Sequence, residues 1–141
     1  RLRRAQATLQ TMELLAADVE RNSELAIELE INEMSRPLHW LVSTTLYRIA
    51  QEALTNILRH AEASLAHVDL RGGKEGVTLV IRDNGKGLAV QADRGLGIIG
   101  MRERANLVGG SFSVESAVDG GTIIAVTIPY ESGVHDQNPP G

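Results

Sequence analysis

Residues 77–87 read VTLVIRDNGKG, an alternating segment that runs into a glycine-rich turn. Apolar side chains recur at every second position, Val77, Leu79 and Ile81, which predicts a strand with one buried face. The same alternation places Asp83 on that buried face. Because a carboxylate that faces a core is costly unless hydrogen-bond donors surround it, Asp83 predicts a binding site at the end of the strand.

The turn after this strand supports two interpretations. Gly85 and Gly87 have no side chains, so a flat ring such as adenine could approach the backbone while its amino group donates to Asp83. Alternatively, Asn84-Gly85 is a pair that commonly closes a β-hairpin. Residues 88–94, which would begin the second strand of such a hairpin, show no strand pattern. Both interpretations stay open at this point.

The rest of the chain alternates between helical and strand periodicity. Three helices are predicted over residues 2–22, 41–60 and 97–108, and five strands over residues 25–31, 66–70, 77–82, 111–115 and 123–128. This order predicts a two-layer α/β sandwich in which helices cover one face of a mixed sheet. The other face is expected to be wetter, because the outward positions carry His67, Asp69, Arg71, Ser113 and Glu115.

The composition is that of one globular domain. Of the 141 residues, 43% are hydrophobic and 23% are charged, which suits a packed core. Cysteine is absent, which excludes disulfides and thiolate metal sites and fits a reducing cytoplasm. The formal net charge of -4 argues against a broad nucleic-acid surface. No apolar run approaches the ~20 residues of a membrane helix, so we expect any membrane anchor to lie outside this chain.

Polar side chains at a spacing of four mark the second helix. Glu52, Asn56 and His60 lie along one side of it, at the border of the apolar stripe. The amide oxygen of Asn56 is a suitable ligand for a hard cation such as Mg²⁺, and Glu52 could orient or deprotonate a reacting group. A solvated helix flank would show the same spacing.

Residues 95–100, GLGIIG, open the third helix with glycines. Free N–H groups and the helix dipole at such a start attract phosphate, and Arg102 and Arg104 add positive charge. The letters also match the dinucleotide fingerprint, but a polar loop precedes them where that fingerprint needs a strand. A glycine-rich helix start without a ligand is the simpler alternative. At the start of the last strand, Thr122 shares a face with the inward apolar residues, so its hydroxyl could join Asp83 at a base-binding site.

Taken in order, these segments resemble the GHKL superfamily of ATP-binding domains. Residues 47–61 resemble its N box, 83–87 its G1 box, 95–104 its G2 box and 120–122 its closing glycine-threonine step. Within this superfamily, the sequences of the N box and the G2 box are most similar to those of sensor histidine kinases of the nitrate-sensor and degradation-sensor class. The resemblance covers roughly residues 25–129 and implies the two-layer Bergerat ATPase fold.

The resemblance implies roles for individual residues. Asn56 would coordinate the Mg²⁺ that bridges the ATP phosphates, and Asp83 would accept a hydrogen bond from the adenine amino group. Glu52 occupies the position of the water-activating base in related ATPases, and residues 88–94 would form a lid. The remaining nucleotide contacts would come from Arg59, His60, Gly85, Gly87, Gly95, Gly97, Gly100 and Thr122.

The resemblance also implies a domain organisation. Residues 1–23 would be a remnant of a dimerisation domain or a linker to it, 24–130 the ATP-binding catalytic domain and 131–141 a disordered tail. The phosphoacceptor histidine of such kinases lies on an upstream dimerisation helix beside an acidic residue. The four histidines of this chain lack that setting: His39, His60, His67 and His135.

The chain is therefore expected to bind ATP without phosphorylating itself. In a homodimeric parent kinase it would donate the γ-phosphoryl group to the dimerisation domain, from which a response regulator would receive it. The domain would be cytoplasmic, in a parent that is either soluble or membrane-anchored. Three alternatives are an anti-sigma-factor-like serine kinase, a nucleotide-binding interaction module and a dinucleotide-dependent oxidoreductase.

Overall fold

The structure is a computed structural model that describes residues 2–32, 37–87 and 97–130. Its elements are, in order, α1 (Leu2–Arg21), β1 (Ala26–Ile31), α2 (Trp40–Asn56), the π-helical turn η1 (Ile57–Ala61), β2 (Leu65–Gly72), β3 (Gly76–Asp83), α3 (Ile98–Leu107), β4 (Ser111–Ser116) and β5 (Thr122–Pro129). The predicted lid, residues 88–94, and the predicted tail, residues 131–141, lie outside the described residues.

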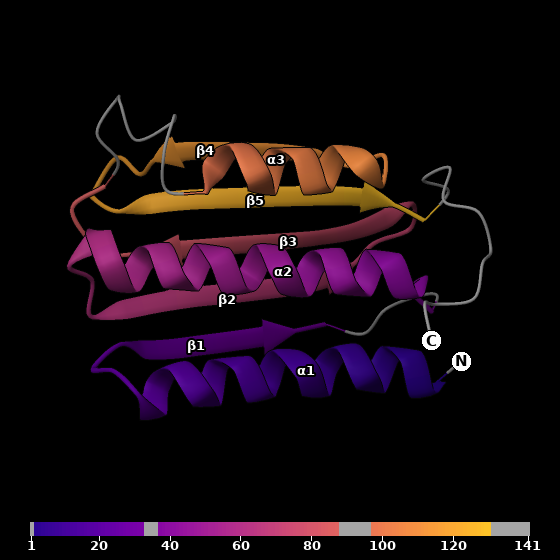
Figure 1. Ribbon diagram of the computed structural model, residues 1–141, viewed down its shortest axis with the longest axis horizontal. Coiled ribbons are helices and arrows are strands. Elements are labelled where there is room, and N and C mark those ends of the chain that lie inside the picture. The colour runs from indigo at the N-terminus through magenta and orange to yellow at the C-terminus, as the bar shows by residue number, and fades with distance from the viewer. Residues whose placement is uncertain (1, 33–36, 88–96, 131–141) are drawn as a thin grey trace.

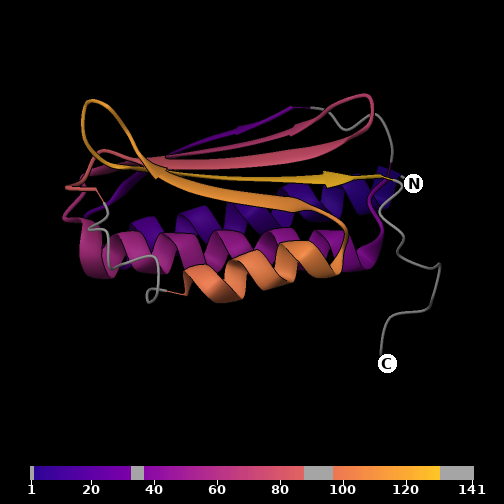
Figure 2. The same cartoon turned by 90° about the horizontal axis from the view of Figure 1, so that it is seen from above.

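The five strands form one mixed sheet in the order β1-β2-β3-β5-β4. β1 pairs with β2 in parallel, and the other three pairs are antiparallel. All three helices lie on the same face of the sheet, as Figure 1 and Figure 2 show from two directions. The predicted two-layer α/β sandwich with one uncovered sheet face is confirmed.

The core lies between the sheet and α2, the central helix of the layer. Alternate residues of β3 point into it, and Val77, Leu79 and Ile81 are at most 1% exposed. These side chains meet the apolar stripe of α2, where Leu46 and Ile49 are fully buried. The alternation that predicted the strand is thus the alternation between core and solvent.

The first helix belongs to the same packed layer. α1 lies beside β1 and α2, and Met12 and Ala16 on its inner side are buried in the core. α1 therefore forms part of the helical layer, and a link from residues 1–23 to a dimerisation domain stays a prediction.

Two sequence alternatives are wrong. The Asn84-Gly85 hairpin fails because β3 pairs with β2 and β5, and the next elements along the chain are α3 and β4. The dinucleotide-binding βαβ unit fails because β4, which follows α3, pairs among the described strands with β5 and not with β3, and the β4–β5 pair is antiparallel. The second helix also differs from its prediction: regular α-helix ends at Asn56, and the last turn is π-helical.

Candidate functional site

Asp83 lies at the end of β3 with only 5% of its surface exposed, on the helix-covered face of the sheet. Its Oδ1 accepts a hydrogen bond from the N–H of Gly85 at 2.8 Å. Burial raises the pKa of the Asp83 carboxyl above its ordinary value, and the backbone N–H groups of Gly85 and Thr122 offset part of that rise. The carboxylate is therefore held in place by backbone donors and has acceptor capacity left for a ligand.

Thr122 lies beside this carboxylate at the start of β5 and is 8% exposed. The predicted meeting of Thr122 and Asp83 on the core face is thus confirmed as geometry. Gly121, just before it, has a φ of +91°, and a methyl group there would collide with the carbonyl oxygen of Asp83. The glycine therefore allows β5 to start directly against the end of β3.

The turn 84–87 is fastened to the end of the second helix. A methyl group at Gly85 would collide with the carbonyl oxygen of Ala61. The same oxygen accepts a hydrogen bond from the N–H of Lys86 at 2.8 Å. Close packing of protein on protein thus requires glycine at 85. The predicted approach of a flat ring to Gly85 and Gly87 stays a prediction.

Asn84 has a structural role that sequence reasoning missed. Its Oδ1 accepts the N–H groups of Ser64 and Leu65 at 2.9 and 3.0 Å, and its Nδ2 donates to Ser64 Oγ at 2.9 Å. Asparagine side chains commonly satisfy loop backbone groups in this way, which is the signal that the sequence offered. The turn is thereby tied to the segment between η1 and β2.

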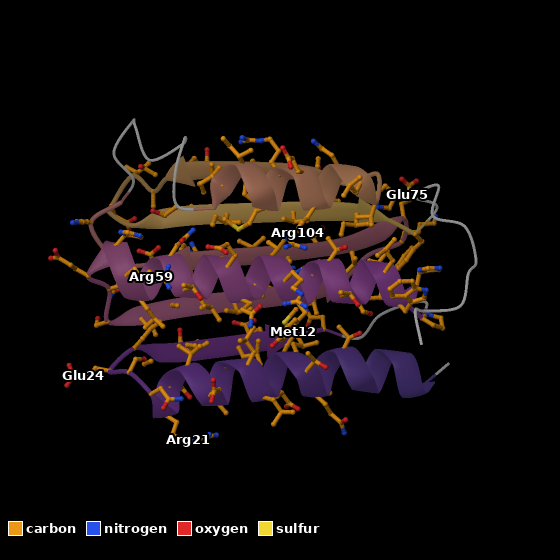
Figure 3. All side chains as sticks on the ribbon, viewed as in Figure 1. Met12, Arg21, Glu24, Arg59, Glu75 and Arg104 are labelled. Carbon is orange, nitrogen blue, oxygen red and sulfur yellow. The ribbon has the colours of Figure 1, made fainter. Side chains whose placement is uncertain are left out.

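The polar residues of the second helix follow its border as far as the π turn. Glu52 and Asn56 are half-buried on α2, as the spacing predicted. Arg59 and His60 are exposed on η1, at the end of the helix that Figure 3 marks with Arg59. The π turn changes the angular spacing, so His60 does not share the half-buried border of Glu52 and Asn56.

Glu52 contacts the start of α3. A methyl group at Gly97 would lie 2.6 Å from Glu52 Oε2, so the carboxylate lies directly against this glycine. Gly97 has a φ of +74° and precedes the first residue of α3, without a side-chain cap on the free N–H groups. Gly100, one turn later, is exposed and borders open space. Gly95 lies outside the described residues.

The elements that carry the described site residues meet at one end of the sandwich, the left end in Figure 1, where α2 and β3 end and α3 and β5 begin. Asp83, Gly85 and Thr122 form one group, and Glu52 and Gly97 form another. The contact between Gly85 and Ala61 joins the first group to the end of the second helix, a few residues from Asn56. A pocket shared by Asn56 and Asp83 stays a prediction, because the lid predicted to close it lies outside the described residues.

A cavity of about 680 Å³ opens elsewhere, on the uncovered face of the sheet. It is lined by outward side chains of the strands, among them His67 and Arg82, and by residues 117–120. Asp83 also borders this cavity at the end of β3, although its side chain lies on the helix-covered face. The predicted site residues of the helices do not line this cavity, because they lie on the opposite face of the sheet.

Across the described residues, none of the helices has the length and apolar character that a bilayer crossing requires.

Residues 42–132 match the family model described as histidine kinase-, DNA gyrase B- and HSP90-like ATPase.

Curated relatives carry the same segment. The signal transduction histidine-protein kinase/phosphatase DegS of Brevibacillus brevis is 39% identical over 90 residues, 62% of this chain and 23% of DegS. The oxygen sensor histidine kinase NreB of Staphylococcus carnosus is 31% identical over 78% of this chain and 33% of NreB. The sensor histidine kinase YxjM of Bacillus subtilis is 38% identical over 82% of this chain and 28% of YxjM. The chain thus spans a third or less of these relatives.

Solved structures share the fold. The ATP-binding domain of PrrB from Mycobacterium tuberculosis superimposes with a TM-score of 0.69 at 24% identity, covering 85% of this chain and 91% of that domain. The Acinetobacter baumannii histidine kinase AdeS gives a TM-score of 0.68 at 18% identity, over 89% of this chain and 64% of AdeS. At these identities the comparison concerns the fold alone.

Proposed function

Because this chain belongs to the histidine kinase-, DNA gyrase B- and HSP90-like ATPases, we propose that it is the Mg-ATP-binding catalytic domain of a sensor histidine kinase. The observation that carries the proposal is Asp83, a buried carboxylate at a strand end that backbone donors hold beside Thr122. The similarity of the chain to sensor histidine kinases over most of the chain's length supports the same assignment.

Asp83 would recognise the adenine base. Gly85 occupies one side of the carboxylate at 2.8 Å, and an ionised carboxylate can accept further hydrogen bonds. The exocyclic amino group of adenine is the donor that would occupy this remaining capacity, with the hydroxyl of Thr122 nearby. A base that presents a carbonyl at that position would place two acceptors against each other, so guanine is expected to bind more weakly.

The start of α3 would receive the phosphates. The first N–H groups of a helix have no partner within the helix, and Gly97 provides no side-chain cap for them. Gly100 leaves open space beside these groups. A helix start of this kind attracts anions through its N–H groups and its dipole. Arg59 and His60, exposed at the neighbouring end of the second helix, would add polar contacts to the phosphates or the sugar.

Asn56 would hold the metal ion. Its half-buried amide supplies the hard oxygen ligand that Mg²⁺ accepts together with phosphate oxygens and water. When bound there, Mg²⁺ would neutralise charge on the phosphates. Glu52, held against Gly97, would orient the incoming nucleophile or accept its proton.

The acceptor of the γ-phosphoryl group would be a histidine on a dimerisation domain outside this chain, and a response regulator would receive the group afterwards. The relatives are named as histidine kinases, and each is about three or more times longer than the matched segment. That length leaves room for such domains in a homodimeric, cytoplasmic or membrane-anchored parent. Nucleic acid is not an expected partner, because the formal net charge is -4.

Titration with a fluorescent ATP analogue, with and without Mg²⁺, tests the site. Asp83→Asn is expected to weaken binding under both conditions, since it removes the acceptor for adenine. Asn56→Asp is expected to change mainly the Mg²⁺ dependence. Equal binding by both variants and the parent would refute the site assignment.

A second experiment tests phosphoryl transfer. Incubation of the chain alone with labelled ATP is expected to give no phosphohistidine. Addition of a dimerisation domain from a related kinase is expected to give phosphohistidine on that domain.

A further inference from the structure

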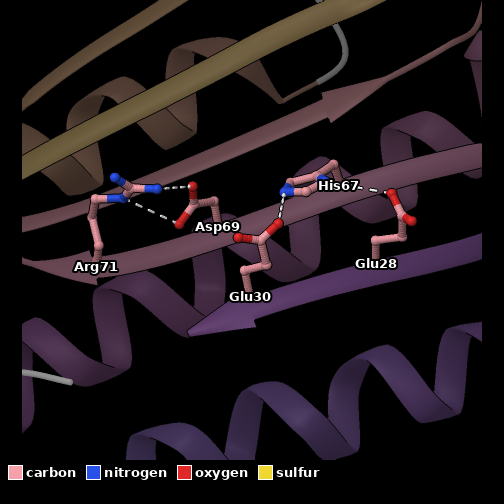
Figure 4. A network of polar contacts seen from close by, with 5 residues as sticks. All are labelled: Glu28, Glu30, His67, Asp69 and Arg71. Atoms are coloured by element: carbon pink, nitrogen blue, oxygen red, sulfur yellow. Dashed lines mark hydrogen bonds and ion pairs between the residues drawn. The ribbon is translucent and has the colours of Figure 1, made fainter. Parts of the chain in front are cut away.

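Four polar side chains form a compact group on the uncovered face of the sheet (Figure 4). Glu28 and Glu30 lie on β1, and His67 and Asp69 lie on β2. The parallel register pairs Glu28 with His67 and Glu30 with Asp69. Residues two apart on a strand share a face, so all four point away from the helices. Three of the four are acidic, and Glu30 lies directly opposite Asp69.

His67 lies between two of these carboxylates. Its Nδ1 is 3.5 Å from Glu28 Oε1, and its Nε2 is 3.1 Å from Glu30 Oε1. A neutral imidazole carries a proton on only one nitrogen, so its other nitrogen presents a lone pair to an anionic oxygen. That contact is repulsive unless a cation, either a second proton or a metal ion, lies at the nitrogen.

Asp69 completes the geometry of a cation site. One nitrogen of His67 and one oxygen each from Glu30 and Asp69 lie within 4.8 Å of one another. In a tetrahedral Zn²⁺ site, bonds of ~2.0–2.1 Å place neighbouring ligand atoms roughly 3.3 Å apart. The Nε2–Oε1 distance of 3.1 Å is close to that spacing. Within the described ranges, this is the only group of three such ligands.

We propose that Glu30, His67 and Asp69 bind a divalent first-row transition metal ion, of which Zn²⁺ is the probe. Imidazole and carboxylate are ligands that such ions accept, and three protein ligands leave a position for water. The half-buried imidazole between the acids distinguishes this group from a simple acidic surface.

Neighbouring residues would support the three ligands. Glu28 would accept the Nδ1–H of His67, which fixes the tautomer that leaves Nε2 free for the metal. Arg71 holds Asp69, with its Nη2 at 2.7 Å from Oδ2. Arg71 Nε also donates to Asp69 Oδ1, at a longer 3.4 Å. Because each carboxylate oxygen has two lone pairs, Oδ1 would still have one to offer the metal.

Metal binding would fasten the edge of the sheet. Among the described strands, β1 lies at the edge of the sheet and pairs with β2. An ion ligated by Glu30 from β1 and by His67 and Asp69 from β2 would connect the two strands through side chains. The three ligands point away from the helices, whereas the side chain of Asp83 in the proposed nucleotide site lies on the helix-covered face.

The test is a titration of Zn²⁺ into the nucleotide-free protein, followed by calorimetry and by NMR of the histidine side chains. The parent is expected to bind one equivalent, with its largest shift at Nε2 of His67. His67→Asn is expected to weaken this binding at least tenfold, and Glu28→Gln by about 10–100-fold, as for other residues that orient a metal ligand. Mg²⁺ is expected not to displace Zn²⁺.

Glu115→Gln is the matched control, because Glu115 is an exposed carboxylate on the same sheet face, on β4. It should leave Zn²⁺ affinity unchanged. Wild-type affinity in His67→Asn, or Zn²⁺ saturation without a shift at His67, would overturn the proposal. The NMR readout on the parent keeps the test decisive even where a variant unfolds.

Discussion

The two faces of the sheet carry carboxylates in opposite circumstances. On the helix-covered face, Asp83 is 5% exposed and is held by backbone N–H groups. On the uncovered face, the side chains of Glu28 and Glu30 are 64% and 58% exposed and crowd around one histidine. Loss of water makes a single acid costly, whereas water and salt screen several acids at a surface. The burial of Asp83 is therefore itself an indication of a ligand. The exposed acids Glu28 and Glu30 indicate a ligand only because they surround His67.

The sharpest test of this contrast compares neighbours on one strand. Leu79 is fully buried on the covered face, and Val80, the next residue of β3, points to the other face. Leu79→Ala is expected to lower the free energy of unfolding by about 2–5 kcal/mol, because it leaves a cavity in the core. Val80→Ala should cost less than about 1 kcal/mol. Urea unfolding of both variants measures the difference; equal losses would mean that the two faces are equally packed.

Gly121 tests whether the close approach at Asp83 is required. Gly121→Ala places a methyl group against the carbonyl oxygen of Asp83 at a φ of +91°. We expect a loss of about 1–3 kcal/mol in unfolding free energy and weaker binding of an ATP analogue, since Thr122 and Asp83 would move apart. Gly73→Ala is the control, because its nearest contact is an ordinary 3.4 Å. The prediction fails if the two variants are equally stable.

Asp83 tests whether its burial serves a ligand rather than the fold. Because its pKa is raised in the folded state, its contribution to stability is present below the ordinary carboxyl pKa and is lost as pH rises through the folded-state pKa. Asp83→Asn cannot ionise. It should therefore unfold at the same temperature as the parent or higher above that pH, while its affinity for an ATP analogue falls about tenfold or more.

Thermal unfolding and ATP-analogue titration across the acidic-to-neutral range measure both effects. In the parent, affinity should also fall as acid protonates Asp83, at a higher pH than for an ordinary aspartate. A variant that loses stability and affinity in parallel at neutral pH would instead indicate a structural role for this carboxylate.

Arg71 is expected to give the smallest effect. Its ion pair with Asp69 lies on the uncovered face, where exposed pairs contribute little and salt weakens them further. Arg71→Ala should leave the unfolding temperature nearly unchanged at high salt. A large loss there would show that this face contributes more to stability than its exposure suggests.

Much of the fold was readable because strand and helix periodicities are local. The alternation around Leu79 predicted β3 and the inward direction of Asp83, and the pattern of the last strand predicted that Thr122 also points inward. The structure confirms all three. Helix ends were less predictable: the π turn after Asn56 changes the position of His60, and no residue type signals such a turn.

Contacts between distant segments could not be read in this way. Asn84 reaches Ser64, Gly97 lies against Glu52, and Gly85 packs on Ala61. Each contact joins residues that are 20 or more positions apart in the sequence, and each depends on how the helices and strands pack against one another. The glycine positions were noticed in the sequence, but the partners that require them were not.

By itself, the sequence determined which side chains face the core, that an acid is among them, and that four motifs follow one another in the order of an ATP-binding domain. Only the tertiary structure decided that β1 lies parallel to β2 and so places Glu28 and Glu30 opposite His67 and Asp69. The physical reason is that side-chain direction follows from backbone geometry within one strand, whereas strand neighbours and their register are selected by the packing of the whole sheet.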